Sequence, residues 1–183
     1  MGWEIDYTKK IDDEQVNGLQ GVHDSLAYKV NEIEKHFHSL ERWYGNSGGT
    51  GGSVDANLTE WQATAGTGEA FGTEVLILSG NNITNNDFGF TPVYFDMHRI
   101  LISSASATNA LYVIQFWGGT DTFGNATLIS ETVYYAGTAV AQSAPVDIRM
   151  NRQPAANKIW ARIKSETNSA TLDFVVGVHA YEG

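Results

Sequence analysis

The chain has 183 residues, contains no cysteine and carries a formal net charge of −10 at pH 7. This length accommodates one sizeable domain and an appendage. The negative charge argues against a protein that wraps nucleic acid or binds membranes through cations, and without cysteine neither a disulfide framework nor a thiolate metal site can form.

The first segment, residues 1–11, places Trp3, Ile5 and Tyr7 at alternate positions on a polar background. This alternation predicts a short extended arm, which either packs on a partner or is a frayed terminus. The segment lacks a basic region followed by an apolar one, so we expect no signal peptide. No stretch approaches the roughly 20 apolar residues of a membrane span, so we expect no membrane partner.

Residues 12–44 predict a helix with a heptad seam. The seam positions are Val16, Leu19, His23, Leu26, Val30, Ile33, Phe37, Leu40 and Tyr44. Their alternating spacing of three and four residues runs for about four heptads, which predicts a coiled coil. Such a narrow stripe is buried best against copies of the same helix. The bulky rings of Phe37 and Tyr44 fit poorly between two helices, so we expect a homotrimer rather than a dimer or a higher oligomer.

The charges beside the seam favour a parallel arrangement of the helices. Between neighbouring chains Lys29 would meet Glu34, and His36 would meet Glu41. The alternative is a single amphipathic helix docked on its own domain, although that contact usually has a wider apolar stripe. We interpret His23 as a polar layer that sets the register; three copies on the axis are also placed to hold an anion, a water or a metal.

Residues 45–53, Gly-Asn-Ser-Gly-Gly-Thr-Gly-Gly-Ser, predict a flexible linker and a domain boundary. In residues 54–183, apolar and β-branched runs recur between turns rich in glycine and asparagine. The runs are Glu74–Ser79, Val93–Ser103, Ala110–Trp117, Thr127–Tyr135, Pro145–Met150, Lys158–Glu166 and Ala170–Tyr181. This pattern predicts an antiparallel, jelly-roll-like β-sandwich, so the expected protein is mainly β with an N-terminal α-helix.

One of these runs, Ala110–Trp117, is apolar on both faces. One face carries Leu111, Val113 and Trp117, and the other carries Tyr112, Ile114 and Phe116. A strand of a monomeric sandwich normally alternates apolar and polar residues. We therefore expect part of the sheet surface to be buried by another subunit.

The sequence contains no nucleotide-binding, hydrolase or metalloprotease motif, so we expect no enzyme, no cofactor and no metal site. Acidic residues of the β region are scattered singly, which is typical of solvated strand faces. His98 and His179 fall in strand patterns, where core or sheet-surface positions are the usual interpretation. His36 and His38 are two residues apart on the expected helix, so their side chains point to different faces and cannot bind one metal together.

One basic face is predicted near the C-terminus. Strand alternation places Lys158, Trp160, Arg162 and Lys164 on the same side of their run. A tryptophan among cations suits contact with an acidic protein or a sugar. The alternative is a solvated face on which the stems of neighbouring side chains cover Trp160.

Four segments of the β region carry a family resemblance. They are Arg99-Ile-Leu-Ile-Ser-Ser-Ala-Ser-Ala, Tyr112-Val-Ile-Gln-Phe with a following Gly-Gly, Lys158-Ile-Trp-Ala-Arg-Ile, and Phe174-Val-Val-Gly-Val-His-Ala-Tyr-Glu. From about Glu69 onward the chain resembles small virion proteins of tailed phages, of the capsid-decoration or head-fibre kind. The resemblance implies a trimeric structural protein on the capsid surface of a virion.

Such a protein would bind its own copies and the major capsid protein or another virion protein. Two surfaces are candidates for the capsid contact: the arm with Trp3, Ile5 and Tyr7, which we favour, and the basic face around Trp160. The alternative function is the receptor- or glycan-binding tip of a phage fibre.

Overall fold

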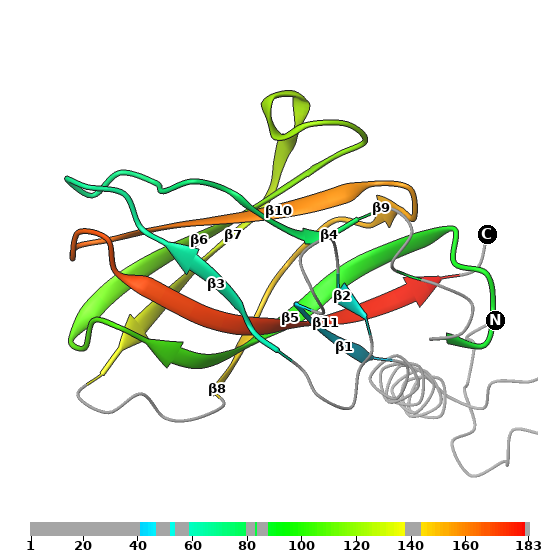
Figure 1. Ribbon diagram of the computed structural model, residues 1–183. Coiled ribbons are helices and arrows are strands. Elements are labelled where there is room, and N and C mark those ends of the chain that lie inside the picture. The colour runs from blue at the N-terminus through cyan, green and yellow to red at the C-terminus, as the bar shows by residue number, and fades with distance from the viewer. Residues whose placement is uncertain are drawn as a thin grey trace, which may run out of the picture. The chain divides into compact units, whose positions relative to one another are not determined.

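The computed structural model describes residues 41–46, 52–53, 59–79, 83, 88–137 and 144–181. The chain divides into two compact units, Met1–Leu40 and Glu41–Gly183, and all described residues belong to the second. They form antiparallel β-sheets (Figure 1), so the prediction of a mainly β protein is confirmed for this unit. No helix among these residues has the length and apolar character needed to cross a membrane.

The larger sheet has seven strands. Its main path follows the order β2 (Gly52–Ser53), β1 (Arg42–Asn46), β11 (Thr171–Tyr181), β5 (Tyr94–Ala105) and β8 (Ala144–Asp147). Two further strands are attached, β3 (Trp61–Thr64) to β11 and β9 (Gln153–Pro154) to β5. The long strands β5 and β11 pair from Tyr94 opposite Tyr181 to Ala105 opposite Leu172, and they organise this sheet.

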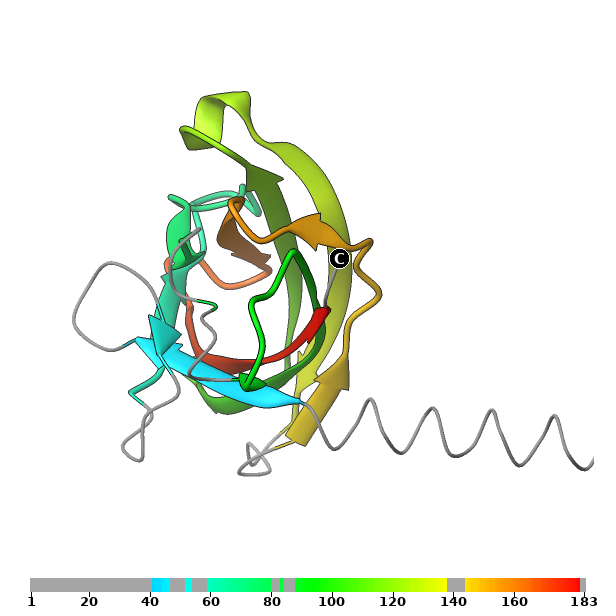
Figure 2. The same ribbon diagram turned by 90° about the vertical axis from the view of Figure 1, so that its right-hand side faces the viewer.

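The smaller sheet has four strands. Their order is β4 (Val75–Leu78), β10 (Lys158–Ser165), β6 (Ala110–Gly119) and β7 (Thr127–Ala136). The connection from β6 to β7 contains a short 3-10 helix, η1 (Phe123–Asn125), and it projects beyond the two sheets in both views (Figures 1 and 2).

The chain passes back and forth between the two sheets. β3, β5, β8 and β11 lie in the larger sheet, whereas β4, β6, β7 and β10 lie in the smaller one. From β3 onward most connections therefore cross from one sheet to the other, with β6 to β7 and β8 to β9 as the exceptions. The sheets curve around a common interior (Figure 2). This arrangement fixes which side chains face inward and which remain on the two outer faces.

The interior is built from large side chains at alternate strand positions. The largest fully buried ones include Trp61, Tyr44, Tyr112, Phe95, Phe116 and Phe174. Burying each such side chain stabilises the fold by roughly 1.5–3 kcal/mol. The polar end of Tyr112 is also satisfied, because its hydroxyl accepts a hydrogen bond from Ala107 N at 3.0 Å and donates one to Ala107 O at 3.2 Å.

Tyr44 corrects the predicted end of the N-terminal helix. It lies in strand β1, pairs with Val176 of β11 and is fully buried, so it does not belong to a coiled-coil seam. Its spacing of four residues from Leu40 continues the heptad pattern, but burial in the β core determines its conformation. The other seam positions, Val16 to Leu40, and the arm residues Trp3, Ile5 and Tyr7 lie outside the described residues.

The predicted linker over residues 45–53 is also corrected, because both of its ends are strands. Gly45 pairs with Ser53 and Asn46 with Gly52 in the β1–β2 pair. A Cβ at Gly45 would collide with the carbonyl oxygen of Thr59, so this glycine permits close packing rather than flexibility. The boundary between the two units falls earlier, between Leu40 and Glu41.

Candidate functional site

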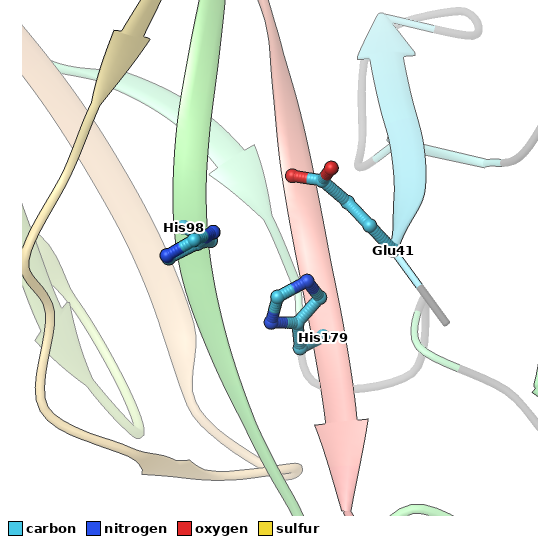
Figure 3. A group of neighbouring side chains, drawn as sticks. All are labelled: Glu41, His98 and His179. Atoms are coloured by element: carbon cyan, nitrogen blue, oxygen red, sulfur yellow. The ribbon is translucent and has the colours of Figure 1, made fainter. Parts of the chain in front are cut away.

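Three side chains of metal-binding type converge on the larger sheet, on the face away from the core (Figure 3). They are Glu41, immediately before β1, His98 on β5 and His179 on β11, and one ligand atom from each lies within 4.8 Å of the other two. The two imidazole rings are 5.0 Å apart between centroids. We refer to these three residues as the Glu41–His98–His179 cluster.

A β-bulge explains how His98 reaches this cluster. Gly177 pairs with Arg99 and the next residue, Val178, pairs with Met97, so His98 is an extra residue in β5. Because a bulge places two successive side chains on about the same face, both His98 and Arg99 approach Glu41. Met97 on the preceding position points into the core and is buried.

Glu41 is held in place by an ion pair and by a glycine. Arg99 Nε donates a hydrogen bond to Glu41 Oε1 at 3.2 Å, and Arg99 Nη2 forms an ion pair with Oε2. This hydrogen bond raises the pKa of Arg99, with the negative charges of Glu41 and Asp147 adding to it against the effect of burial. The carboxylate passes so close to Gly177 that a Cβ there would collide with it. The Glu41 side chain is consequently only 3% exposed.

A second acidic residue, Asp96, lies close to His179. Asp96 Oδ1 lies 3.7 Å from His179 Nδ1, and Asp96 Oδ2 accepts a hydrogen bond from the hydroxyl of Tyr181 at 2.8 Å. Burial, the hydrogen bond to Asp96 and the charge of Asp96 raise the pKa of Tyr181 to about 12, although Arg152 opposes the shift. The guanidinium of Arg152 stacks 3.6 Å from the centre of the Tyr181 ring.

An open hollow of about 410 Å³ adjoins the cluster. Asp96 and His98 line it, together with Asp147 at the end of β8 and with Arg149 and Asn151, which follow β8. A small polar ligand or an ion can reach His98 through such an opening. The arrangement is therefore chemically suited to holding a cation between a carboxylate and two imidazoles.

The sequence did not reveal this cluster. His98 and His179 lie in strands as predicted, but their proximity depends on the bulge and on the register of β5 with β11. Glu41 was expected to pair with His36 of a neighbouring helix, and in the structure its carboxylate is instead engaged by Arg99. Only the strand pairing of distant segments brings the three residues together.

The smaller sheet has a second notable surface, on the face away from the core. Cross-strand pairing places Leu111 beside Tyr135 and Val113 beside Val133, and Trp117 pairs with Leu128 at the far end of the two strands. Val133 is 53% exposed and Tyr135 is 59% exposed. We call the surface formed by Leu111, Val113, Leu128, Val133 and Tyr135 the β6–β7 face.

A polar row crosses the middle of this sheet. Gln115 donates a hydrogen bond from Nε2 to Glu131 Oε2 at 2.7 Å, and its Oε1 accepts one from Arg162 Nε at 3.0 Å. The same oxygen accepts a hydrogen bond from Trp117 Nε1 at 3.1 Å. These polar groups therefore have partners within the chain, although they lie among apolar neighbours.

Aromatic rings surround the guanidinium of Arg162. Its central carbon lies 4.6 Å from the ring centre of Trp117, 4.7 Å from that of Phe71 and 5.5 Å from that of Phe123. Such distances are within the range of cation–π attraction. The guanidinium is thus held by its own chain.

The predicted basic face is only partly as expected. Trp160 shares a face with Arg162, but it is only 7% exposed and meets the edge of the Phe123 ring at 6.3 Å. Of the two interpretations of this face, the structure agrees with a covered tryptophan, although the cover includes the Phe123 ring of the projecting β6–β7 connection. Lys158 donates a hydrogen bond to Asp121 O at 2.9 Å, and Lys164 Nζ lies 5.3 Å from the ring centre of Phe71.

No protein-family model matches this chain, and no curated protein matches it at a significant level.

Proposed function

We propose that this chain is a structural virion protein that assembles as a homotrimer and decorates, or projects from, a phage capsid. The observation that carries the proposal is the β6–β7 face, a row of exposed apolar side chains on a long strand at the edge of a sheet. The sequence resemblance to capsid-decoration and head-fibre proteins agrees with it.

The strand order supports a jelly roll, the finer form of the sandwich. β3, β11, β5 and β8 follow one another in the larger sheet, and β4, β10, β6 and β7 follow one another in the smaller sheet. These eight strands, four in each sheet, have an arrangement found in many viral capsid and lectin domains. The architecture therefore suits both a virion protein and a sugar-binding tip.

We assign the β6–β7 face to contact with a second copy of this chain. β7 has 10 residues and, within the described part of the chain, pairs only with β6. A long apolar edge strand invites uncontrolled pairing unless something covers it. Covering this face with another subunit would leave Gln115 with partners, because it already bonds to both Glu131 and Arg162 within its own chain.

For the capsid contact we favour the arm with Trp3, Ile5 and Tyr7. An apolar terminal arm can become ordered on a repetitive lattice, and three linked arms can exceed the affinity of one by about 10²-fold or more when all engage together. The basic face is a weaker candidate, since Trp160 is buried and Arg162 is held by its own chain.

Two measurements test this function. Light scattering on the purified protein should give about three times the chain mass of 20.0 kDa. Sedimentation with phage capsids stripped of their outer proteins should carry the protein into the pellet. Deletion of residues 1–11 should abolish this while leaving the trimer intact. A monomer at micromolar concentration, or a full-length protein that stays in the supernatant, would contradict the proposal.

The aromatic cluster around Arg162 favours a second candidate, the glycan-binding tip of a phage fibre. Trp117 and Phe123 form a ring pair 5.4 Å apart beside the polar row of Gln115 and Glu131, and sugars commonly stack on such rings. A glycan array separates the two functions. Binding of a defined glycan that Trp117→Ala abolishes would favour the tip, whereas an array without signal would favour the structural role.

A further inference from the structure

We propose that Glu41, His98 and His179 bind a divalent first-row transition-metal ion, of the class to which Zn²⁺ belongs. A carboxylate and two imidazoles form a common ligand set for such ions, which need no cysteine. The inference is independent of the assembly role, because it concerns a different sheet and a different face.

The spacing of the ligand atoms fits the ion after a small adjustment. Nitrogen and oxygen ligands lie about 2.0–2.1 Å from Zn²⁺, so tetrahedral ligand atoms are about 3.4 Å from one another. In the structure the three atoms lie within 4.8 Å of one another. All three backbones are fixed at or beside paired strands of one sheet. The remaining difference would therefore be closed by rotation of the side chains.

Asp96 lies on the side of His179 where a metal-binding histidine usually has its second partner. Metal-binding histidines usually direct their other ring nitrogen toward a carboxylate or a carbonyl group. Asp96 lies on the Nδ1 side of His179 at 3.7 Å and is itself fixed by the hydroxyl of Tyr181. A proton on Nδ1 would then face Asp96, and Nε2 would bind the ion.

Arg99 acts as the counter-charge when the ion is absent. The buried carboxylate of Glu41 needs a cation, and Arg99 supplies it. An arriving divalent ion would compete with this guanidinium. Arg99 has an alternative partner, since Asp147 lies opposite it in the β5–β8 pair and its charge already acts on Arg99. The Arg99 side chain is 29% exposed and therefore has room to turn.

The test is titration of chelator-treated full-length protein with Zn²⁺ by calorimetry, with Co²⁺ absorption as a report on the ligands. One ion should bind per chain and raise the thermal midpoint. His98→Ala and His179→Ala should each weaken binding by about tenfold or more. If a variant with alanine fails to fold, the near-isosteric Glu41→Gln serves the same purpose. An absence of Zn²⁺ binding to the wild type, or unchanged binding in these variants, would overturn the proposal.

The remaining histidines provide the matched control. His23, His36 and His38 are the other histidines of the chain, and replacing all three with alanine should leave the affinity unchanged. Loss of binding in this triple variant, with retention in His98→Ala, would overturn the assignment.

The variant Arg99→Gln distinguishes the proposed site from nonspecific binding of Zn²⁺ to surface histidines. Removal of the competing cation should lower the stability of the metal-free protein and raise the affinity for Zn²⁺. A variant that binds Zn²⁺ no better than the wild type would show that Glu41 is not a ligand.

Discussion

The carboxylate of Glu41 and the guanidinium of Arg99 form a two-point ion pair that spans strand β11 above Gly177. Arg99 and Gly177 are direct partners in the β5–β11 pair, and Glu41 reaches them from the start of β1. Three strands of the larger sheet are thus tied together at one point, next to the two histidines. The absence of a side chain at residue 177 is what makes this arrangement possible.

Gly177→Ala should therefore destabilise the protein. The added methyl group would push the Glu41 carboxylate away from Arg99, and overpacking of this kind typically costs about 1–3 kcal/mol. Denaturant unfolding measures the loss. Gly124→Ala is the control, since a Cβ there meets nothing within 4 Å, and it should change the free energy of unfolding by less than about 0.5 kcal/mol. Equal stabilities of the two variants would refute this role of Gly177.

The protein should lose stability in alkali as the Tyr181 phenol ionises. Burial and the hydrogen bond to Asp96 raise its pKa from 10.0 to about 12. The folded protein therefore holds the phenolic proton more tightly than the unfolded chain does. The resulting stabilisation is complete below pH 10 and is lost as the pH rises through about 12.

Unfolding free energies measured across this pH range should decline less steeply in Tyr181→Phe than in the wild type. Tyr94→Phe, at the partner position on β5, is the control and should decline as the wild type does. The same slope in all three proteins would show that Tyr181 ionises as an ordinary exposed tyrosine.

Arg162→Ala should destabilise the smaller sheet. The change removes the hydrogen bond to Gln115 and the contacts with the rings of Trp117 and Phe71, which together contribute about 1–2 kcal/mol. Arg162→Lys should recover only part of this, because lysine lacks the planar fork of donors. Lys158→Ala removes one exposed hydrogen bond and should change the stability by less than about 0.5 kcal/mol. If Arg162→Ala proves as stable as Lys158→Ala, the ring contacts contribute nothing.

The long strands were predictable because they are apolar and β-branched runs bounded by turns rich in glycine and asparagine. Residues Tyr112, Ile114 and Phe116 of β6 are fully buried, as expected for the inward side of a two-faced strand. By contrast, β1 was hidden, because Tyr44 fits a heptad as well as a strand, and β3 has only four residues in a polar region. The local sequence pattern thus predicts strands that are long enough to stand out between turns. Short strands form only because they pair with distant strands, which the local pattern does not reveal.

The candidate site could not be predicted for a related reason. Residues Glu41, His98 and His179 are far apart in the sequence, and a one-residue bulge between Gly177 and Val178 decides whether His98 faces Glu41. No spacing rule within a single segment carries that information. Similarly, the sequence left open whether Trp160 is exposed or covered, because nothing in its own strand indicates that Phe123 lies over it.

The central claim, that the β6–β7 face is buried between copies of the chain, is tested most directly by thiol accessibility. The chain has no cysteine, so a single introduced thiol reports on one position. Val133 and Val93 are similarly exposed within one chain, at 53% and 43%, but only Val133 lies on the β6–β7 face. The measurement is the rate of alkylation of Val133→Cys relative to Val93→Cys in the full-length protein. We predict much slower alkylation of Val133→Cys, with the difference lost on dilution to the monomer and in denaturant; equal rates in the concentrated, folded protein would contradict the account.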